Sequence, residues 1–512
     1  MAISRLTSIL HILKPQKYIH LDQYVARALG KLWGEHIGED ERLVEQLVNL
    51  DTLSKYYEKL NEFFLHLQEK FGFQNLCDVY WFLQWIDEKS LGKEELGLKN
   101  YFQSKGFQFR DEQIFAFYNA LKTKGFVILA GLSGTGKTKI AQLFAELIVD
   151  DKEKQICFLS VRPDWRDSTS LIGYYNPITV KYQSTPLLEL ILNAEKEYKE
   201  NEKKKPYFLI LDEMNLAHVE YYFADFLSVL ESGREDNGFT REKIKLHSAG
   251  VVKDEKGAEI PENIALPPNI YVIGTVNIDE TTYMFSPKVL DRAFTIEFRD
   301  VDLKIYPTDT TAQGGSWENL KEVISNDLVN DGKFYAHNKE YIKNVVNELG
   351  GFKDELSELN NVLLPYDLGF GYRVVDEIAL FLKNAKNQKE FLPELKENVY
   401  KDLAVLMKVL PKFHGPKGKV EAPLIKVLLR CFGMDELSRK AKSWEDISHL
   451  FKEIKQKQVA ESQEAKTEGA ESPRDVLTEW DIFQNKFKYP LTAKKVLEML
   501  ARLYETGFTS FM

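Results

Sequence analysis

Apolar residues follow two different patterns along the chain, and the change between them marks its middle section. Spacings of three and four residues dominate the first hundred residues and return after about residue 300, which predicts amphipathic helices. The section between them carries short continuous apolar runs, as expected for strands buried on both faces of a parallel sheet. These runs are Phe126–Ala130, Ile156–Val161, Tyr207–Leu211 and Ile270–Thr275. We therefore expect a three-layer α/β domain over residues 109–300.

The flanking segments divide by composition. Residues 1–108 and 301–455 are expected to be helical regions. Residues 456–475 are polar, rich in Glu, Ala and Ser and nearly free of large apolar side chains. Because such a stretch cannot bury a core, we expect a linker there. Residues 476–512 are expected to form a small C-terminal helical segment.

Composition narrows the class of protein. The chain has 512 residues, 44% of them hydrophobic, and a formal net charge of −10, which favours a folded protein and weighs against one that coats nucleic acid with its whole surface. No apolar run reaches the roughly 20 residues of a membrane span, so we expect a cytoplasmic protein without a membrane contact. Cys77, Cys157 and Cys431 are far apart in sequence, which argues against a disulfide framework or a cysteine zinc site.

A glycine-rich phosphate loop follows the first apolar run. The pattern G-x-x-x-x-G-K-[ST] is formed by Gly131, Leu132, Ser133, Gly134, Thr135, Gly136, Lys137 and Thr138. A strand precedes it and a helical pattern follows, which is the context that this motif requires. Backbone N–H groups of such a loop converge on phosphate oxygens, and the helix start adds its positive dipole end. Lys137 would reach the β- and γ-phosphates and Thr138 would bind Mg²⁺.

Paired acids close the third apolar run. Asp212 and Glu213 follow Tyr207–Leu211 directly. At the end of a buried strand beside the phosphate-loop strand, Asp212 is suited to hold Mg²⁺, and Glu213 to orient and deprotonate the attacking water. Together with the loop, these acids predict an Mg²⁺-dependent nucleoside-triphosphatase.

Two later residues have alternative interpretations. Asn277 follows the fourth run, where it could contact the γ-phosphate or the lytic water, or serve as a turn or capping residue. Arg292 follows Asp291. It could point at a neighbouring subunit's γ-phosphate, or pair with Asp291. The residues alone leave both alternatives open.

The order of these motifs resembles the AAA+ superfamily, and more closely its McrB-like branch, the motor subunits of modification-dependent, type IV-like DNA restriction systems. The resemblance is carried by Val161–Trp165 with Leu171–Pro177, by Leu211–Ala217 and by Gly274–Thr282. It covers residues 109–300 well and weakens through the following helical region to about residue 430.

The resemblance implies roles for single residues. Asn277 would be the sensor-1 residue, and Arg292 the arginine finger that acts in trans. Arg373 resembles a sensor-2 arginine from a helical lid, although a surface salt bridge explains it equally well. The segment containing Tyr174 and Tyr175 falls where these rings insert a hairpin, and the two tyrosines would either line a pore or pack the hairpin.

The resemblance also implies a partner and a substrate. It predicts a hexameric ring that hydrolyses ATP or GTP and powers or regulates DNA cleavage by a separate McrC-like nuclease. DNA would be contacted by that partner or by residues 1–108, acting as an adaptor or recognition region. The alternative is a protein-remodelling ATPase of the MoxR type. The McrB signature Met-Asn-x-x-Asp is altered here, because Val276 precedes Asn277 and the acid is Asp279 or Glu280.

Overall fold

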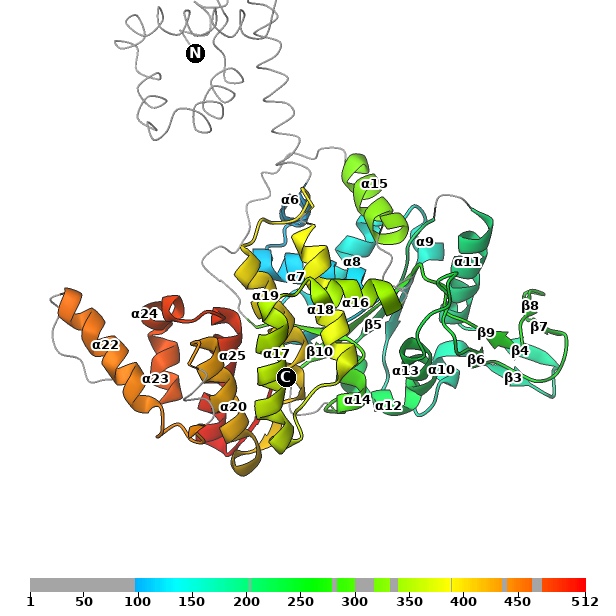
Figure 1. The fold of residues 1–512 in the computed structure, drawn as a ribbon. Helices are drawn as coiled ribbons and strands as arrows, with labels where there is room; N and C mark the ends of the chain where they lie inside the picture. The colour runs from blue at the N-terminus through cyan, green and yellow to red at the C-terminus, as the bar shows by residue number, and fades with distance from the viewer. Residues whose placement is uncertain are drawn as a thin grey trace, which may run out of the picture. The chain divides into compact units, whose positions relative to one another are not determined.

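A parallel five-stranded sheet lies at the centre of the computed structural model (Figure 1). The structure describes residues 97–201, 204–278, 283–299, 317–331, 339–387, 389–434, 440–462 and 472–512. Most of the predicted N-terminal region, together with Asp279 and Glu280, lies outside these ranges. The strands, in the order β11-β1-β10-β5-β2, are Phe294–Phe298, Phe126–Gly131, Ile270–Asn277, Tyr207–Asp212 and Ile156–Ser160. Every pairing is parallel.

The fold class predicted from the apolar runs is confirmed, with two corrections. The sheet has a fifth strand, β11, which the search for continuous apolar runs missed because polar Thr295 and Glu297 alternate with its apolar residues. The expectation that the strand carrying Asp212 lies beside the phosphate-loop strand is also wrong. β10 lies between them and pairs with both β1 and β5. The residues at the end of β10 therefore stand between the loop and the acids.

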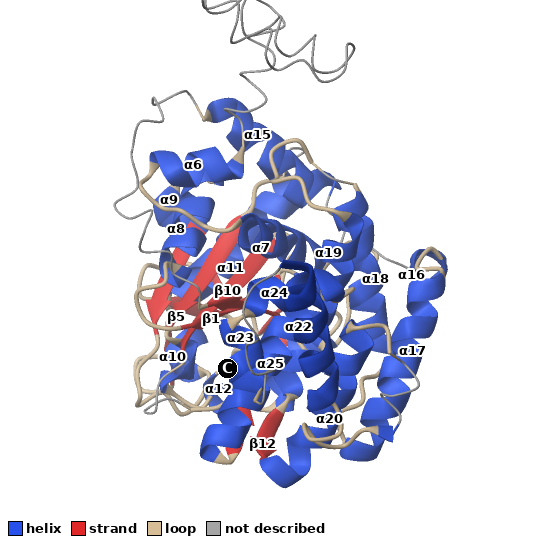
Figure 2. Cartoon of the chain, turned by 90° about the vertical axis from the view of Figure 1, so that its left-hand side faces the viewer, coloured by secondary structure: helices blue, strands red, loops and turns tan. Residues whose placement is uncertain are grey.

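Helices cover both faces of the sheet and complete the three layers (Figure 2). On one face α7 (Asp111–Lys124) and α8 (Lys137–Ile148) pack through aromatic contacts, with the ring of Phe144 at 5.2 Å from that of Phe117 and 6.1 Å from that of Phe208. The other face packs alternate strand residues against α11 (Pro186–Glu200), α13 (Ala224–Glu231) and α14 (Pro287–Leu290). The continuous apolar runs arise because both faces are buried.

A second, small sheet projects from the domain at the right of Figure 1. Its order is β3-β4-β7-β8, with bounds Tyr174–Asn176, Lys181–Gln183, Val252–Asp254 and Glu259–Ile260. The β3–β4 pair is the hairpin expected from the family resemblance. Tyr174 is exposed, whereas Tyr175 is half-buried near His247, at 6.3 Å between ring centroids. β6 (Ile244–Lys245) and β9 (Asn263–Ile264) pair within the segment between β5 and β10 that also contains β7 and β8.

The region after the sheet is helical. Its longer helices are α15 (Glu318–Asn326), α16 (Lys339–Asn347), α17 (Gly351–Leu363), α18 (Tyr372–Lys386), α19 (Glu397–Lys408), α20 (Lys417–Cys431), α22 (Ser448–Ser462) and α25 (Pro490–Thr506). Shorter elements include the π-helix Asp327–Asp331, α23 (Pro473–Thr478) and the strand pair β12 (His414–Pro416) and β13 (Phe508–Ser510). None of the described helices is long and apolar enough to span a bilayer.

The predicted linker is helical at its start. α22 continues through Ser462, so residues 456–462 extend a helix instead of beginning a linker. The helix is anchored just before this point, where the buried ring of Phe451 stacks on Trp444 and Lys455 pairs with Glu479 at 2.8 Å. Residues with good helix propensity can continue a helix once packing has nucleated it.

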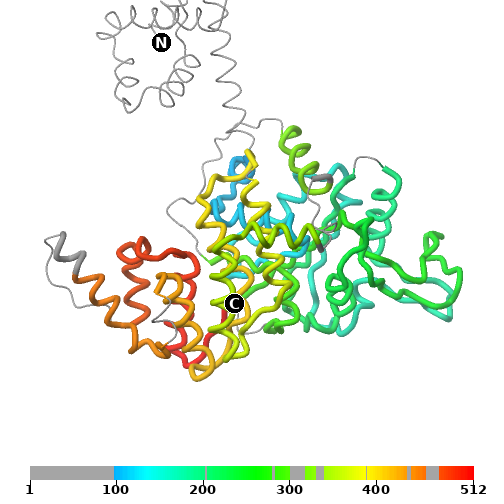
Figure 3. The backbone as a smooth tube through the Cα atoms, in the orientation of Figure 1, coloured from blue at the N-terminus to red at the C-terminus, as the bar shows by residue number. Residues whose placement is uncertain are grey.

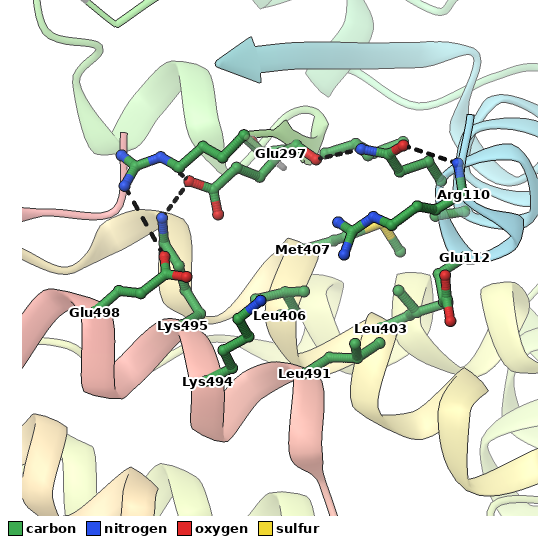
Figure 4. Close-up of a pocket in the computed structure, with 15 residues that line it drawn as sticks. Arg110, Glu112, Glu297, Leu403, Leu406, Met407, Leu491, Lys494, Lys495 and Glu498 are labelled. Carbon is green, nitrogen blue, oxygen red and sulfur yellow. Dashed lines mark hydrogen bonds and ion pairs between the residues drawn. The ribbon is translucent and has the colours of Figure 1, made fainter. Parts of the chain in front are cut away.

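The C-terminal helix α25 docks against the edge of the central sheet. Asp402 accepts hydrogen bonds from the first backbone N–H groups of α25, those of Leu491 and Thr492, at 2.7 and 2.8 Å. Further along, buried Lys495 forms an ion pair with Glu297 of β11. Figure 4 shows this contact beside a cavity of about 80 Å³ lined by the same side chains. Residues 476–512 are therefore part of the domain's packing.

Replacing Lys495 with Met should destabilise the protein by about 2 kcal/mol, because the largely buried Glu297 carboxylate would keep only Arg299 as an ion-pair partner among the described residues. Burial lowers the pKa of Lys495 to about 8. The charged form is therefore costly to bury, and its removal offsets part of the destabilisation. The midpoint of chemical denaturation measures the change. Lys488→Met is the matched control, since its pair with Glu355 is exposed and should contribute under about 1 kcal/mol. Equal midpoints for both variants would contradict the anchoring role.

Candidate nucleoside-triphosphate hydrolysis site

The phosphate loop runs from the end of β1 to the start of α8. Two glycines are required by its geometry. A Cβ at Gly131 would lie 2.0 Å from the carbonyl oxygen of Phe298, so only glycine fits between β1 and β11. Gly136 has φ +89° and caps α8, a conformation that favours glycine. The loop thus presents its backbone N–H groups and the N-terminus of α8 to one point, as an anion site requires.

Lys137 lies at the mouth of the loop. Its ammonium donates to the carbonyl oxygens of Gly131 at 3.0 Å and Leu132 at 2.5 Å. Burial lowers the pKa of Lys137, and the charges of Asp212 and Glu213 oppose that effect. The cation is therefore held between the loop and the acids, where it can exchange carbonyl oxygens for phosphate oxygens.

Thr138 and Asp212 meet as the sequence predicted. The Thr138 hydroxyl donates to Oδ1 of Asp212 at 2.7 Å. A hydroxyl and a carboxylate oxygen side by side are hard oxygen ligands, and Mg²⁺ characteristically binds through one or two such protein groups together with substrate phosphates and water. The donor set fits Mg²⁺, which would be held by Thr138 and Asp212 and would neutralise charge on the phosphates.

Asn277, the residue expected as sensor 1, contacts Glu213, the residue expected as the general base. The Asn277 side-chain amide donates to Oε1 of Glu213 at 2.6 Å. Glu213 has φ +54°, a left-handed conformation that is unusual for a residue with a side chain and that is often found at functional sites. This turn directs the carboxylate toward the end of β10 and away from the strand axis of β5. The arrangement suits a general base held in one orientation.

Thr275 and Asn215 support these groups and were missed by sequence reasoning. The buried Thr275 hydroxyl donates to Oδ1 of Asp212 at 2.7 Å and accepts from the backbone N–H of Glu213 at 3.0 Å. Buried Asn215 donates to the carbonyl oxygen of Asn277 at 2.9 Å. Both lie within the segments that carry the family resemblance, but only the position of β10 beside β5 gives them this role.

Arg292 lies near the amino-terminal ends of the strands, whereas the phosphate loop lies at their carboxyl-terminal ends. The register pairs Gly131 with Phe298 and Val127 with Phe294, so the start of β11 is roughly 13 Å from the phosphate loop, and Arg292 comes two residues earlier still. Its side chain is 13% exposed, pairs with Glu231 and donates to the carbonyl oxygen of Lys288 at 2.7 Å. It does not pair with Asp291, which binds Lys412 at 2.6 Å. Arg292 cannot serve its own phosphate loop.

Arg373 accompanies Arg292. Its Nη1 is 2.8 Å from Oε1 of Glu231, so one carboxylate holds both guanidinium groups. Burial, and after it the positive charge of Arg373, lowers the pKa of Arg292. The ion pair expected as the simpler interpretation of Arg373 is therefore present. A sensor-2 role on its own subunit's nucleotide does not fit this place, because Arg373 starts α18 beside the amino edge of the sheet.

Removing the Thr275 hydroxyl should slow hydrolysis. Thr275→Val keeps the shape but takes a donor from Asp212 and an acceptor from the N–H of Glu213, which should lower kcat at least about 10-fold. Steady-state hydrolysis and nucleotide affinity measure this. Thr295→Val is the matched control, because the buried hydroxyl of Thr295 has no hydrogen-bond partner among the described residues. A similar loss in both variants would assign the effect to packing alone.

Comparisons with known proteins cover two parts of the chain. Residues 126–294 match the AAA domain (dynein-related subfamily), and residues 324–508 match a domain of unknown function (DUF8727). No protein of curated function matches the chain. Among solved structures, it is similar to the crystal structure of a candidate ATPase from Cytophaga hutchinsonii, with 14% identity and a TM-score of 0.35 over 64% of this chain and 90% of that one.

The family match agrees with the site, since residues 126–294 contain the phosphate loop, the paired acids, Asn277 and Arg292. Residues 126–294 thus match the AAA domain family and carry a site arranged for nucleoside-triphosphate hydrolysis.

Proposed function

We propose that the protein is a ring-forming AAA+ nucleoside-triphosphatase that powers or regulates DNA restriction by a separate nuclease subunit. The hydrolysis itself is supported by one observation above all, the contact of Thr138, Asp212, Thr275, Glu213 and Asn277 in a single hydrogen-bonded group. The role in restriction rests on the McrB-like segments and on the paired hairpins at β3–β4 and β7–β8.

The position of Arg292 supports the proposed ring. A cation held at the amino edge of the sheet is remote from its own nucleotide, yet a guanidinium on the γ-phosphate is the usual accelerating group in this chemistry. A neighbouring copy, docked with its phosphate loop against this edge, would receive Arg292 and complete a shared site. A hexamer is the assembly that the family resemblance implies.

Nucleotide choice and partner class are tested together. Hydrolysis of ATP and GTP is measured side by side, with and without DNA, and with the nuclease encoded nearest to this gene. Stimulation by DNA or by that nuclease supports the restriction role. Stimulation by neither, together with nucleotide-driven remodelling of a protein complex, would support the MoxR-type alternative.

Two substitutions separate binding from chemistry. Glu213→Gln should keep nucleotide binding while slowing hydrolysis by roughly 10²–10⁴-fold, because the general base is lost. Lys137→Ala should abolish binding, because the phosphates lose their main cation. Affinity for a fluorescent nucleotide and steady-state turnover distinguish these outcomes. Normal turnover by Glu213→Gln would remove that carboxylate from the mechanism.

Arg292→Ala should show a defect in trans. Alone it should lower kcat by roughly 10³-fold or more, the range for a lost arginine finger. Mixed rings prepared by co-expression with Glu213→Gln subunits should regain activity, since those subunits supply the arginine. Mixed rings without recovery at any ratio would count against shared sites.

A further inference from the structure

A buried lysine from the helical region donates hydrogen bonds to the backbone on both sides of Arg292. The Lys408 side chain, at the end of α19, is completely buried. Its ammonium donates to the carbonyl oxygens of Ala293 at 2.9 Å and Asp291 at 3.2 Å. These carbonyl oxygens belong to the residues on either side of Arg292, so one cation holds the backbone before and after the arginine.

The charge of Lys408 is balanced from a neighbouring helix. Glu377 of α18 forms an ion pair with Lys408 at 2.6 Å and a second pair with Lys124 at the end of α7. Burial lowers the pKa of Lys408 to about 8, and Glu377 opposes that effect. A buried cation is costly unless it is paired and hydrogen-bonded. Lys408 meets that condition only while Glu377 and the two carbonyl oxygens stay in place.

Two further contacts hold the same segment. Lys412 pairs with the Asp291 carboxylate at 2.6 Å. Arg373, one helical turn before Glu377 on α18, reaches Arg292 through their shared partner Glu231. Figure 3 shows the α18–α19 segment against α7, in agreement with the Lys124–Glu377 pair. The Arg292 backbone is thus held by α19, and its side chain is linked to α18.

We propose that α18 and α19 position Arg292 for the γ-phosphate of a neighbouring copy, with Lys408 as the central positioning residue. This inference rests on the proposed shared site. It gives a role to part of residues 324–508, whose matching family has no known function. A shift of α18 or α19 would move the carbonyl oxygens flanking Arg292, so these helices couple the state of one subunit to hydrolysis in the next.

The test is whether loss of Lys408 acts in trans. Lys408→Met should lower kcat by about 10- to 100-fold through misplacement of Arg292, with the nucleotide KM unchanged. In mixed rings with Glu213→Gln subunits, which carry an intact arginine segment, activity per Lys408→Met subunit should recover. Lys495→Met is the matched control, a second buried lysine with its pKa lowered to about 8. Any loss of kcat in Lys495→Met should not be corrected in mixed rings, because Lys495 pairs with Glu297 of β11.

The outcomes separate the inference from the proposed function. Recovery for Arg292→Ala but not for Lys408→Met would overturn the positioning role and leave the shared site intact. Recovery for neither would overturn both. Should circular dichroism show that Lys408→Met does not fold, Lys412→Met replaces it, because Lys412 pairs with the Asp291 carboxylate and its loss leaves the buried Lys408–Glu377 pair in place. Its smaller kcat loss should also be corrected in mixed rings, and a loss without correction would refute the proposal.

Discussion

The position of β10 between β1 and β5 is the constraint on which the hydrolysis site depends. Parallel strands end at a common edge, so this order places Asn277 opposite Gly131 and brings Thr275 next to Asp212. Asp212 reaches past β10 to the Thr138 hydroxyl of the phosphate loop. Thr275 and Asn277 of β10 bind Asp212 and Glu213, so the metal ligand, the base and the loop form one hydrogen-bonded unit. Local features such as the left-handed Glu213 are tolerated because this unit holds them.

The same sheet separates the two halves of the chemistry. Its carboxyl edge carries the loop, the acids and the sensor, while its amino edge carries Arg292 with Glu231. In the proposed mechanism a single chain therefore carries its arginine at the wrong end of its own strands. Association of copies in the proposed ring would resolve this separation, and the buried contacts of Lys408 would make the helical region a participant in it.

Sequence reasoning succeeded where chemistry is local and failed where it depends on neighbours. The phosphate loop, Asp212 and Glu213 can be identified from their residue types at the end of an apolar strand, and the structure brings them together. Thr275 has no such signal, because a threonine in a strand is ordinary until its neighbour is known. β11 was missed because polar Thr295 and Glu297 interrupt its apolar residues. The packing of α25 was missed because lysine, the residue type at position 495, is ordinarily solvent-exposed. The place of Arg373 depends on a contact 142 residues away, with Glu231.

The projecting sheet ties together two insertions that are remote in sequence. The insertion that contains β3 and β4 follows β2, whereas the one that contains β7 and β8 follows β5. β4 and β7 pair in parallel. A strand with an unpaired edge invites association with other chains, so each hairpin protects an edge of the other. The two insertions consequently form one sheet, which leaves the central domain after β2 and returns to it before β10, the strand that carries Thr275 and Asn277.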